Sequence, residues 1–394
     1  MVRPILKKTL VNALILILAL GASFGAGEVV VRVFFGDSVS LFPRYHTDYR
    51  YGDFTLRGIR PNADFWHKSA DGSWEFITNN RGFRNTTDFE YRKSAGTIRV
   101  LSLGDSHTQG YEVRQDATFS AVLERYLTGR GLKAEVINAG VSGFSTAEAL
   151  AFLENEGVRY EPDIVVLGFY ANDFEDNLKA GLFGLDEKSS LIALKQEHVP
   201  GVKVQNFIYA IPLTQWLGEN SYFYSLLFNS TWQYFKKKLG REARQRRLSG
   251  GVAGTSVDDG FEYAVASRRT FNAHEVDLAT ALIMRMWQFC VTRDIRLIVV
   301  DITTRADSYR VSSSLPEPVV DELENAGVEL LLSDAVLGRF SGAVEMHRPN
   351  GDHHISEFTH ALIGAELGRR ILNDALGHAG PEAAKDAHRF RDRR

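Results

Sequence analysis

The sequence lacks several features by which common classes of protein are recognised. Cys290 is the only cysteine among 394 residues, so an intrachain disulfide and a cysteine-based metal cluster are both excluded. The net charge is only -3 at pH 7, which gives no sign of nucleic-acid binding. No spacing of His, Asp and Glu residues is typical of a metal site, and no internal repeat is present. We therefore expect no metal and no nucleic-acid partner.

What the sequence does contain is the composition of an ordinary globular protein. Apolar residues make up 44% and charged residues 24% of the chain, a balance that excludes a largely disordered protein. A length of 394 residues is enough for one large domain or two smaller ones.

An uncharged, mostly apolar run near the N-terminus stands apart from the rest of the chain. Residues 10–27, LVNALILILALGASFGAG, follow the basic residues Arg3, Lys7 and Lys8. As a helix this run is about 27 Å long, close to a hydrocarbon core of roughly 30 Å. Basic residues on the shorter side place that side in the cytoplasm and the remaining chain outside. A signal peptide cut among the small residues at 22–26 is the alternative, but we favour a retained anchor because the apolar character resumes at VVVRVFF.

Residues 36–96 are expected to form a β-rich apron between the anchor at 1–35 and the main domain. The segment lacks long helical patterns and is rich in aromatic residues and turns. The alternation in SWEFIT predicts hairpin strands, broken by the turn at 79–82, NNRG.

Residues 97–376 alternate between strand and helix patterns. Helices are predicted at 118–131, at 146–158 with Thr146 as N-cap, and at 355–376. Buried strands are predicted at 98–104, 134–140, 163–170, 296–303 and 328–334. This alternation predicts an α/β fold, a three-layer α/β/α sandwich with a five-stranded parallel sheet.

A long insertion at 176–273 interrupts the alternation, and a polar tail follows at 377–394. Within the insertion an aromatic segment at 222–235, YFYSLLFNSTWQYF, leads into KKKLGREARQRR at 236–247, and a linker follows from 248. The insertion is either a lid whose aromatic residues fill its own core or a surface that binds acyl chains, sugar rings or an anionic glycan or phospholipid surface.

Reactive residue types gather where the predicted strands end. The carboxyl ends of parallel strands meet at one edge of a sheet, which is where active sites of such folds lie. A serine, a glycine, an asparagine and an Asp-His pair together are the parts of an acyl-transfer site. The residues concerned are Ser106, Gly143, Asn172, Asp352, His353 and His354.

The order of these motifs, GDS, NAGVSG, ND and a terminal Asp-His, resembles the SGNH/GDSL hydrolase family. The resemblance implies an acyl-serine mechanism without a cofactor. It implies that Ser106 is the nucleophile, that Asp352 and His354 complete a triad, and that the Ser106 N–H, the Gly143 N–H and the Asn172 amide form the oxyanion hole. The apron sequence ITNNRGFRN is similar to that of membrane-anchored bacterial members.

Two motifs depart from the pattern of the family. Tyr170 stands where the third motif usually has a glycine, which is expected to narrow the site. The last motif usually reads Asp-x-x-His, whereas Asp352 lies two residues before His354 and one before His353. We choose His354 because HISEFTHALIGAEL matches the helix that follows the catalytic histidine in the family, and His353 is the alternative base. Gly140 is the alternative to Gly143.

The sequence therefore predicts a serine ester hydrolase anchored in a bacterial cell membrane with its catalytic domain in the periplasm. Its expected substrate is a lipid-like ester or an acylated glycan, from which it removes small acyl groups. An SGNH-type O-acyltransferase that modifies an envelope or exported polysaccharide is the first alternative. A non-catalytic glycan-binding or assembly protein with the same fold is the second.

Overall fold

The central element of the fold is the predicted five-stranded parallel sheet. The computed structural model describes residues 2–248, 271–305, 309–350 and 354–378. In it the strand order is β12-β11-β7-β5-β6, and every neighbouring pair is parallel. The strands are β5 (Ile98–Gly104), β6 (Ala134–Asn138), β7 (Ile164–Phe169), β11 (Arg296–Asp301) and β12 (Glu329–Leu331).

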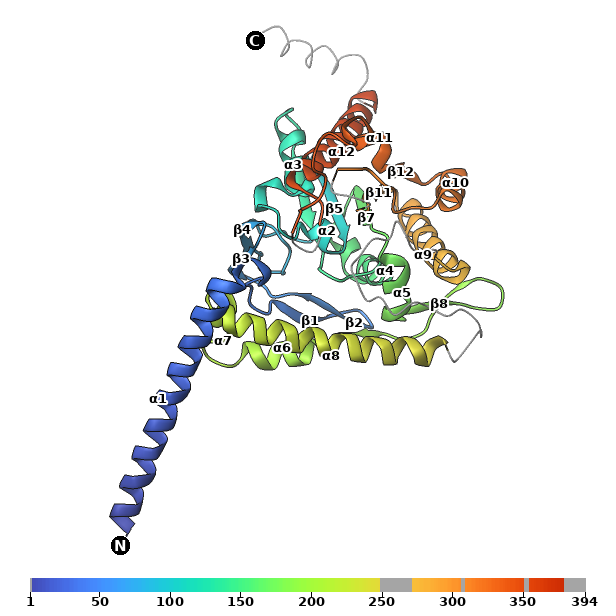
Figure 1. Ribbon diagram of the computed structural model, residues 1–394. Helices are drawn as coiled ribbons and strands as arrows, with labels where there is room; N and C mark the ends of the chain where they lie inside the picture. The colour runs from blue at the N-terminus through green and yellow to red at the C-terminus, as the bar shows by residue number, and fades with distance from the viewer. Residues whose placement is uncertain (1, 249–270, 306–308, 351–353, 379–394) are drawn as a thin grey trace, which may run out of the picture.

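Helices cover both faces of this sheet, as Figure 1 shows. Leu101 and Leu103 of β5 pack on one side, whereas Val100 packs in a separate cluster on the other. Because side chains alternate along a strand, a strand with helices on both faces reads as a continuous apolar run. One face carries α4 (Thr146–Asn155), α9 (Ala273–Val291) and α10 (Glu317–Ala326). The other carries α3 (Phe119–Thr128) and α12 (Glu357–His378), with α11 (Ser333–Leu337) beside them.

The prediction that Thr146 caps α4 is wrong by one residue. Ser145 is the N-cap, with extended backbone angles, and its N–H donates to the carboxylate of Glu148 at 2.8 Å. Thr146 is already helical, and its N–H donates to Asp173 at 2.9 Å. A neighbouring element thus supplies the acceptor that local sequence was expected to provide.

The apron contains two antiparallel hairpins. They are formed by β1 (His46–Tyr51) with β2 (Phe54–Ile59), and by β3 (Asp64–Ser69) with β4 (Gly72–Ile77). The SWEFIT segment is β4, as predicted, but its partner precedes it, so the turn at 79–82 ends β4 and does not close a hairpin.

The insertion is joined to the apron. It begins within α5 (Asp173–Ala180) and continues with β8 (Phe183–Leu185) and β9 (Leu191–Ala193), which pair with each other. The short strand β10 (Glu197–His198) then pairs with β2, and α6 (Val202–Tyr209), α7 (Thr214–Asn220) and α8 (Tyr222–Leu248) follow.

The aromatic and basic segments of the insertion form one helix, α8, along the lower edge of the body in Figure 1. Its aromatic residues pack against the apron and the N-terminal helix. The Arg44 guanidinium lies 4.6 Å from the ring centre of Phe228 and 5.4 Å from that of Trp232. These contacts give Phe228 and Trp232 a packing role, but against the apron and not in a core of the insertion's own, as the first interpretation had expected. Most of the predicted linker lies outside the described residues.

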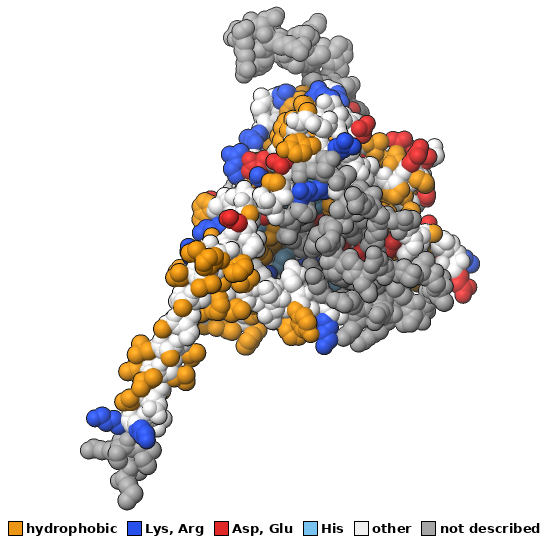
Figure 2. All heavy atoms as spheres, in the orientation of Figure 1, with side chains coloured by type: hydrophobic (Ala, Val, Ile, Leu, Met, Phe, Trp, Pro, Cys, Tyr) orange, Lys and Arg blue, Asp and Glu red, His pale blue; other side chains and the backbone are white. Residues whose placement is uncertain are grey.

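The N-terminal helix α1 (Val2–Phe34) extends away from the body (Figure 1). Within it, Lys7–Phe34 has a mean hydropathy of 2.2 in its most apolar window, and only 6% of that window is buried. Figure 2 shows apolar side chains along most of its visible length. By length and composition it is able to cross a membrane, as either an anchor or a signal sequence.

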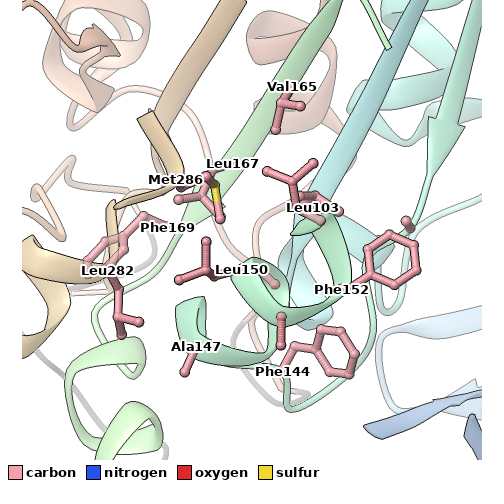
Figure 3. Packing of buried hydrophobic residues seen from close by; sticks show 14 of the residues in the cluster. Leu103, Phe144, Ala147, Leu150, Phe152, Val165, Leu167, Phe169, Leu282 and Met286 are labelled. Atoms are coloured by element: carbon pink, nitrogen blue, oxygen red, sulfur yellow. The ribbon is translucent and has the colours of Figure 1, made fainter. Parts of the chain in front are cut away.

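Leu150 tests the packing between α4 and the sheet. Its side chain is fully buried beside Leu167 and Leu103 in the cluster of Figure 3. Leu150→Ala is expected to lower the free energy of unfolding by about 2–5 kcal/mol, because it removes buried methyl groups and leaves a cavity. Denaturant titration of the full chain measures this. Leu194→Ala, at an exposed leucine, is the control, and an equal effect of both changes would contradict the packing described.

Candidate active site

The turn after β5 is built so that Ser106 is free to react. A Cβ at Gly104, where φ is +144°, would collide with the Thr108 side chain and the Gly168 carbonyl, so this position requires glycine. Asp105 is the N-cap of α2 (Ser106–Gln109), and its carboxylate accepts the N–H of His107 at 2.8 Å. The helix is therefore capped by the aspartate, and the serine hydroxyl is left for another contact.

That contact is with His354. The Nε2 atom of His354 lies 2.7 Å from the Oγ atom of Ser106, and both side chains are buried. Burial lowers the pKa of His354 to about 3, and His67 and His347 contribute in the same direction. The imidazole is consequently neutral near pH 7, which is the form that accepts a proton from a nucleophilic serine.

The third member of a triad would be a carboxylate at the Nδ1 atom of His354. This atom has no hydrogen-bond partner among the residues that the structure describes. In a triad this nitrogen donates to the carboxylate that orients the ring. Asp352, predicted for that part, and His353, the alternative base, both lie outside the described residues, so their roles remain predictions.

Tyr111 and a second histidine, His107, pack against His354. Its ring centre lies 4.7 Å from that of Tyr111 and 4.8 Å from that of His107. The Nδ1 atom of His107 accepts the N–H of Ile355 at 3.4 Å. Tyr170, which replaces the family's glycine, packs on His107 with ring centres 4.1 Å apart. These contacts leave His354 buried, and His107 holds the backbone that follows it.

Asn172 and Asp173 lie at the end of β7, close to the nucleophile turn. The Nδ2 atom of Asn172 donates to Asp176 at 3.1 Å. Burial raises the pKa of Asp105 to about 7. Hydrogen bonds, including one from the Asn172 side chain, act in the opposite direction and lower it. Asn172 is thus held beside the residue that precedes Ser106. Asp173 has a bracing role, because it accepts the N–H groups of Thr146 at 2.9 Å and Tyr170 at 3.1 Å.

The two candidate glycines after β6 are required for different reasons. A Cβ at Gly140 would collide with the backbone of Gln109, so this glycine allows β6 to leave the sheet against α2. Gly143 has a φ of +79°, and its carbonyl accepts a hydrogen bond from Arg57. Close packing thus accounts for Gly140, whereas the part of Gly143 in an oxyanion hole stays a prediction.

Arg84 is a site residue that sequence reasoning missed. It lies in the apron motif ITNNRGFRN, is buried, and donates to the loop that follows α2. Its acceptors are the carbonyls of Gln109 at 2.9 Å, Gly110, and Val113 at 2.6 Å, and the Oε1 atom of Gln115 at 3.0 Å.

The charge of Arg84 is held by carbonyl oxygens and an aromatic face. Its guanidinium lies 4.6 Å from the ring centre of Phe76. Burial lowers its pKa to about 9, so it remains cationic at neutral pH. The apron therefore fixes the loop that carries Tyr111, one of the rings against His354. The only feature of the sequence that pointed to Arg84 was the motif ITNNRGFRN that contains it.

A family comparison places the first motifs of the site in one matched segment. Residues 102–280 match the model of the GDSL-like Lipase/Acylhydrolase family. The matched segment contains Ser106, Gly143 and Asn172 but ends before His354, so the assignment of His354 depends on its hydrogen bond to Ser106.

The individual proteins to which the chain is similar are distant from it. An arylesterase of Vibrio mimicus is 32% identical over 80 residues, which are 20% of this chain and 40% of the relative. The match thus spans two fifths of that protein. A lipase/acylhydrolase structure from Enterococcus faecalis is 17% identical, with a TM-score of 0.37, over 70% of this chain and 95% of that one. A two-domain esterase active on acetylated mannans is 12% identical, with a TM-score of 0.37, over 71% and 50% of the two chains.

Arg84→Lys tests whether the apron positions the site. Lysine keeps the charge but cannot make the same set of hydrogen bonds. Ester turnover is expected to fall on the order of 10- to 100-fold in kcat, with little change in KM, because the loop behind His354 shifts while the substrate contacts remain.

Arg81→Lys in the same motif is the matched control, since Arg81 is exposed and its guanidinium lies on Tyr91. Equal kcat values for the two variants, in folded protein, would refute a positioning role for Arg84.

Proposed function

We propose that the protein is an ester hydrolase that acts through an acyl-serine intermediate. The observation that carries this proposal is the 2.7 Å contact between the Ser106 Oγ and His354 Nε2 atoms. His354 takes the proton of Ser106 as the oxygen attacks the ester carbonyl carbon, and then gives it to the departing alcohol. Water, deprotonated by the same nitrogen, next attacks the acyl-serine, releases the acid and returns Ser106.

We propose that the remaining predicted residues act in their expected parts. Asp352 would orient His354 through Nδ1. The N–H groups of Ser106 and Gly143 and the side-chain amide of Asn172 would stabilise the oxyanion of the tetrahedral intermediates. Removing one such donor commonly slows catalysis by about 10²–10³-fold.

We further propose that α1 is a retained anchor with the active site on the exported side of the membrane. The basic residues before the apolar run support this orientation. Retention is supported by contacts between α1 and the body: Phe24 packs edge-on against Phe223, with ring centres 5.3 Å apart, and Val31 is buried with Val39 and Leu41. Cutting at 22–26 would remove or free part of this packed junction.

The proposed substrate is a small acyl ester on a carbohydrate or a lipid-linked glycan. This follows from the location, because glycans are assembled and modified on the exported face of the membrane. Small acyl groups also suit a base packed closely against Tyr111 and His107, with Tyr170 behind His107.

Replacing either member of the Ser106–His354 pair is expected to abolish turnover. Hydrolysis of p-nitrophenyl acetate and butyrate by Ser106→Ala and His354→Ala should fall on the order of 10⁴-fold or more. Ser102→Ala is the matched control, because Ser102 is buried within β5, four residues before Ser106, and its hydroxyl has no hydrogen-bond partner among the described residues. Activity that survives His354→Ala would move the base to His353. Absence of turnover in well-folded protein would favour acyl transfer or glycan binding.

The pH dependence of kcat/KM tests the state of His354. The neutral imidazole is the active form, and burial lowers its pKa from 6.5 to about 3. Activity should therefore persist as the pH falls through 6.5 and decline only near the lowered pKa. A stopped assay with a non-ionising ester measures this profile. An acid limb at or above pH 6.5 would contradict burial as the dominant influence on this pKa. It would instead be the result of a carboxylate at Nδ1, the part proposed for Asp352.

A further inference from the structure

The insertion exposes apolar side chains to solvent on the side of the body from which α1 extends. Such a surface is unusual for a globular protein and marks an interaction site. Phe207 is 69%, Leu213 73% and Trp216 60% exposed. We call this surface, on α6, α7 and the first half of α8, the apolar platform. Its exposed members are Val204, Phe207, Tyr209, Ile211, Leu213, Trp216, Leu227, Tyr234 and Phe235.

The helix α6 shows that this exposure has a pattern. Val202 and Gln205 face the body and are buried, whereas Val204 and Phe207, three residues apart, lie on one outer face, and Ile211 follows just beyond the helix. The outward face of an isolated surface helix is normally polar. Figure 2 shows apolar side chains gathered where α1 meets the body, continuous with those of α1 itself.

A set of hydrogen bonds fixes α8 to α1. The carboxylate of Glu28 accepts the Ser221 hydroxyl at 2.8 Å and the N–H groups of Phe223 at 3.0 Å and Tyr222 at 3.2 Å. Arg32 pairs with Glu28 at 2.7 Å and donates to the Asn220 carbonyl at 3.0 Å. An acidic side chain of α1 thus caps the N-terminus of α8, so the helices hold a fixed mutual orientation.

The position of Glu28 sets the level of the platform relative to a membrane. The uncharged run at 10–27 is about 27 Å long and nearly fills a hydrocarbon core of roughly 30 Å. Glu28 and Arg32 then lie at the membrane surface, and α8 begins at that level. Figure 1 shows α6, α7 and α8 together along the edge of the body nearest to α1.

The chemistry of the platform matches that of a lipid interface. Tryptophan, tyrosine and phenylalanine are the side chains favoured at the boundary of headgroups and acyl chains. The sequence at 236–247 has seven basic residues and one acidic residue, a composition that favours anionic headgroups.

We propose that the apolar platform docks into the surface of the same bilayer that α1 enters, with anionic lipid as its partner. The platform then holds the catalytic domain flat against the membrane, at a fixed height, so that esters at or near the lipid surface reach the site. This inference rests on the proposed retention of α1 as an anchor.

The test uses the full chain with a single environment-sensitive label. Phe207→Cys is labelled with nitrobenzoxadiazole and placed in nanodiscs of phosphatidylglycerol and phosphatidylethanolamine, one protein copy per disc, with and without doxyl-labelled lipid. Cys290 stays in place, because it is buried and burial raises the pKa of its thiol to about 12. Val291→Cys is the control, an exposed valine on α9 away from α1. Leu16→Cys reports on α1.

The expected result is a blue-shifted emission that doxyl lipid quenches at 207 and at 16, but not at 291. If doxyl lipid quenches the label at 16, but the label at 207 behaves like the one at 291, the docking of the platform is overturned and the anchor is retained. An unquenched label at 16 would refute the anchor. A label at 207 that is shielded only when discs hold two copies would identify a second chain as the partner and overturn the lipid assignment. Unchanged thermal unfolding of each labelled variant checks the fold.

Discussion

The structure depends on one hydrogen bond between residues 248 positions apart, Ser106 and His354. It requires β5 and the approach to α12 to meet at the carboxyl edge of the sheet. The sheet places the first, and packing of α12 against α3 places the second. Because both partners are buried, the histidine is neutral and the serine proton has a single acceptor among the described residues. The packing that buries this pair thus sets both the distance between Ser106 and His354 and the neutral state of the imidazole.

Titratable side chains around this pair serve mainly to fix the backbone. Asp105 caps α2, Asp173 holds the first turn of α4 against β7, and Arg84 holds the loop after α2. Burying a charge is costly unless it is matched by hydrogen bonds. Here the apron supplies one of the three groups, which makes it part of the active-site scaffold as well as a connection to α1.

Local patterns were sufficient for the sheet and for the nucleophile turn. The five strands read as apolar runs because helices cover both faces. The nucleophile turn is readable because Gly104 must be glycine and Asp105 caps the helix that follows. Features that depend on distant partners were not predictable. Nothing local links β10 to β2 or Glu28 to the start of α8. The capping box of Ser145 with Glu148, in contrast, was readable from the local sequence and was missed. Asp352 remains a prediction for a different reason, since it lies outside the described residues.

Covalent trapping tests the central claim most directly. The full chain is treated with a fluorophosphonate, which reacts with a serine only when a base removes its proton, and the adduct is located by peptide mass spectrometry. The account predicts one adduct, on Ser106, that is lost when His354 is replaced by alanine. Folded protein that acquires no adduct, or acquires it on another residue, would contradict the assignment of Ser106 as an activated nucleophile.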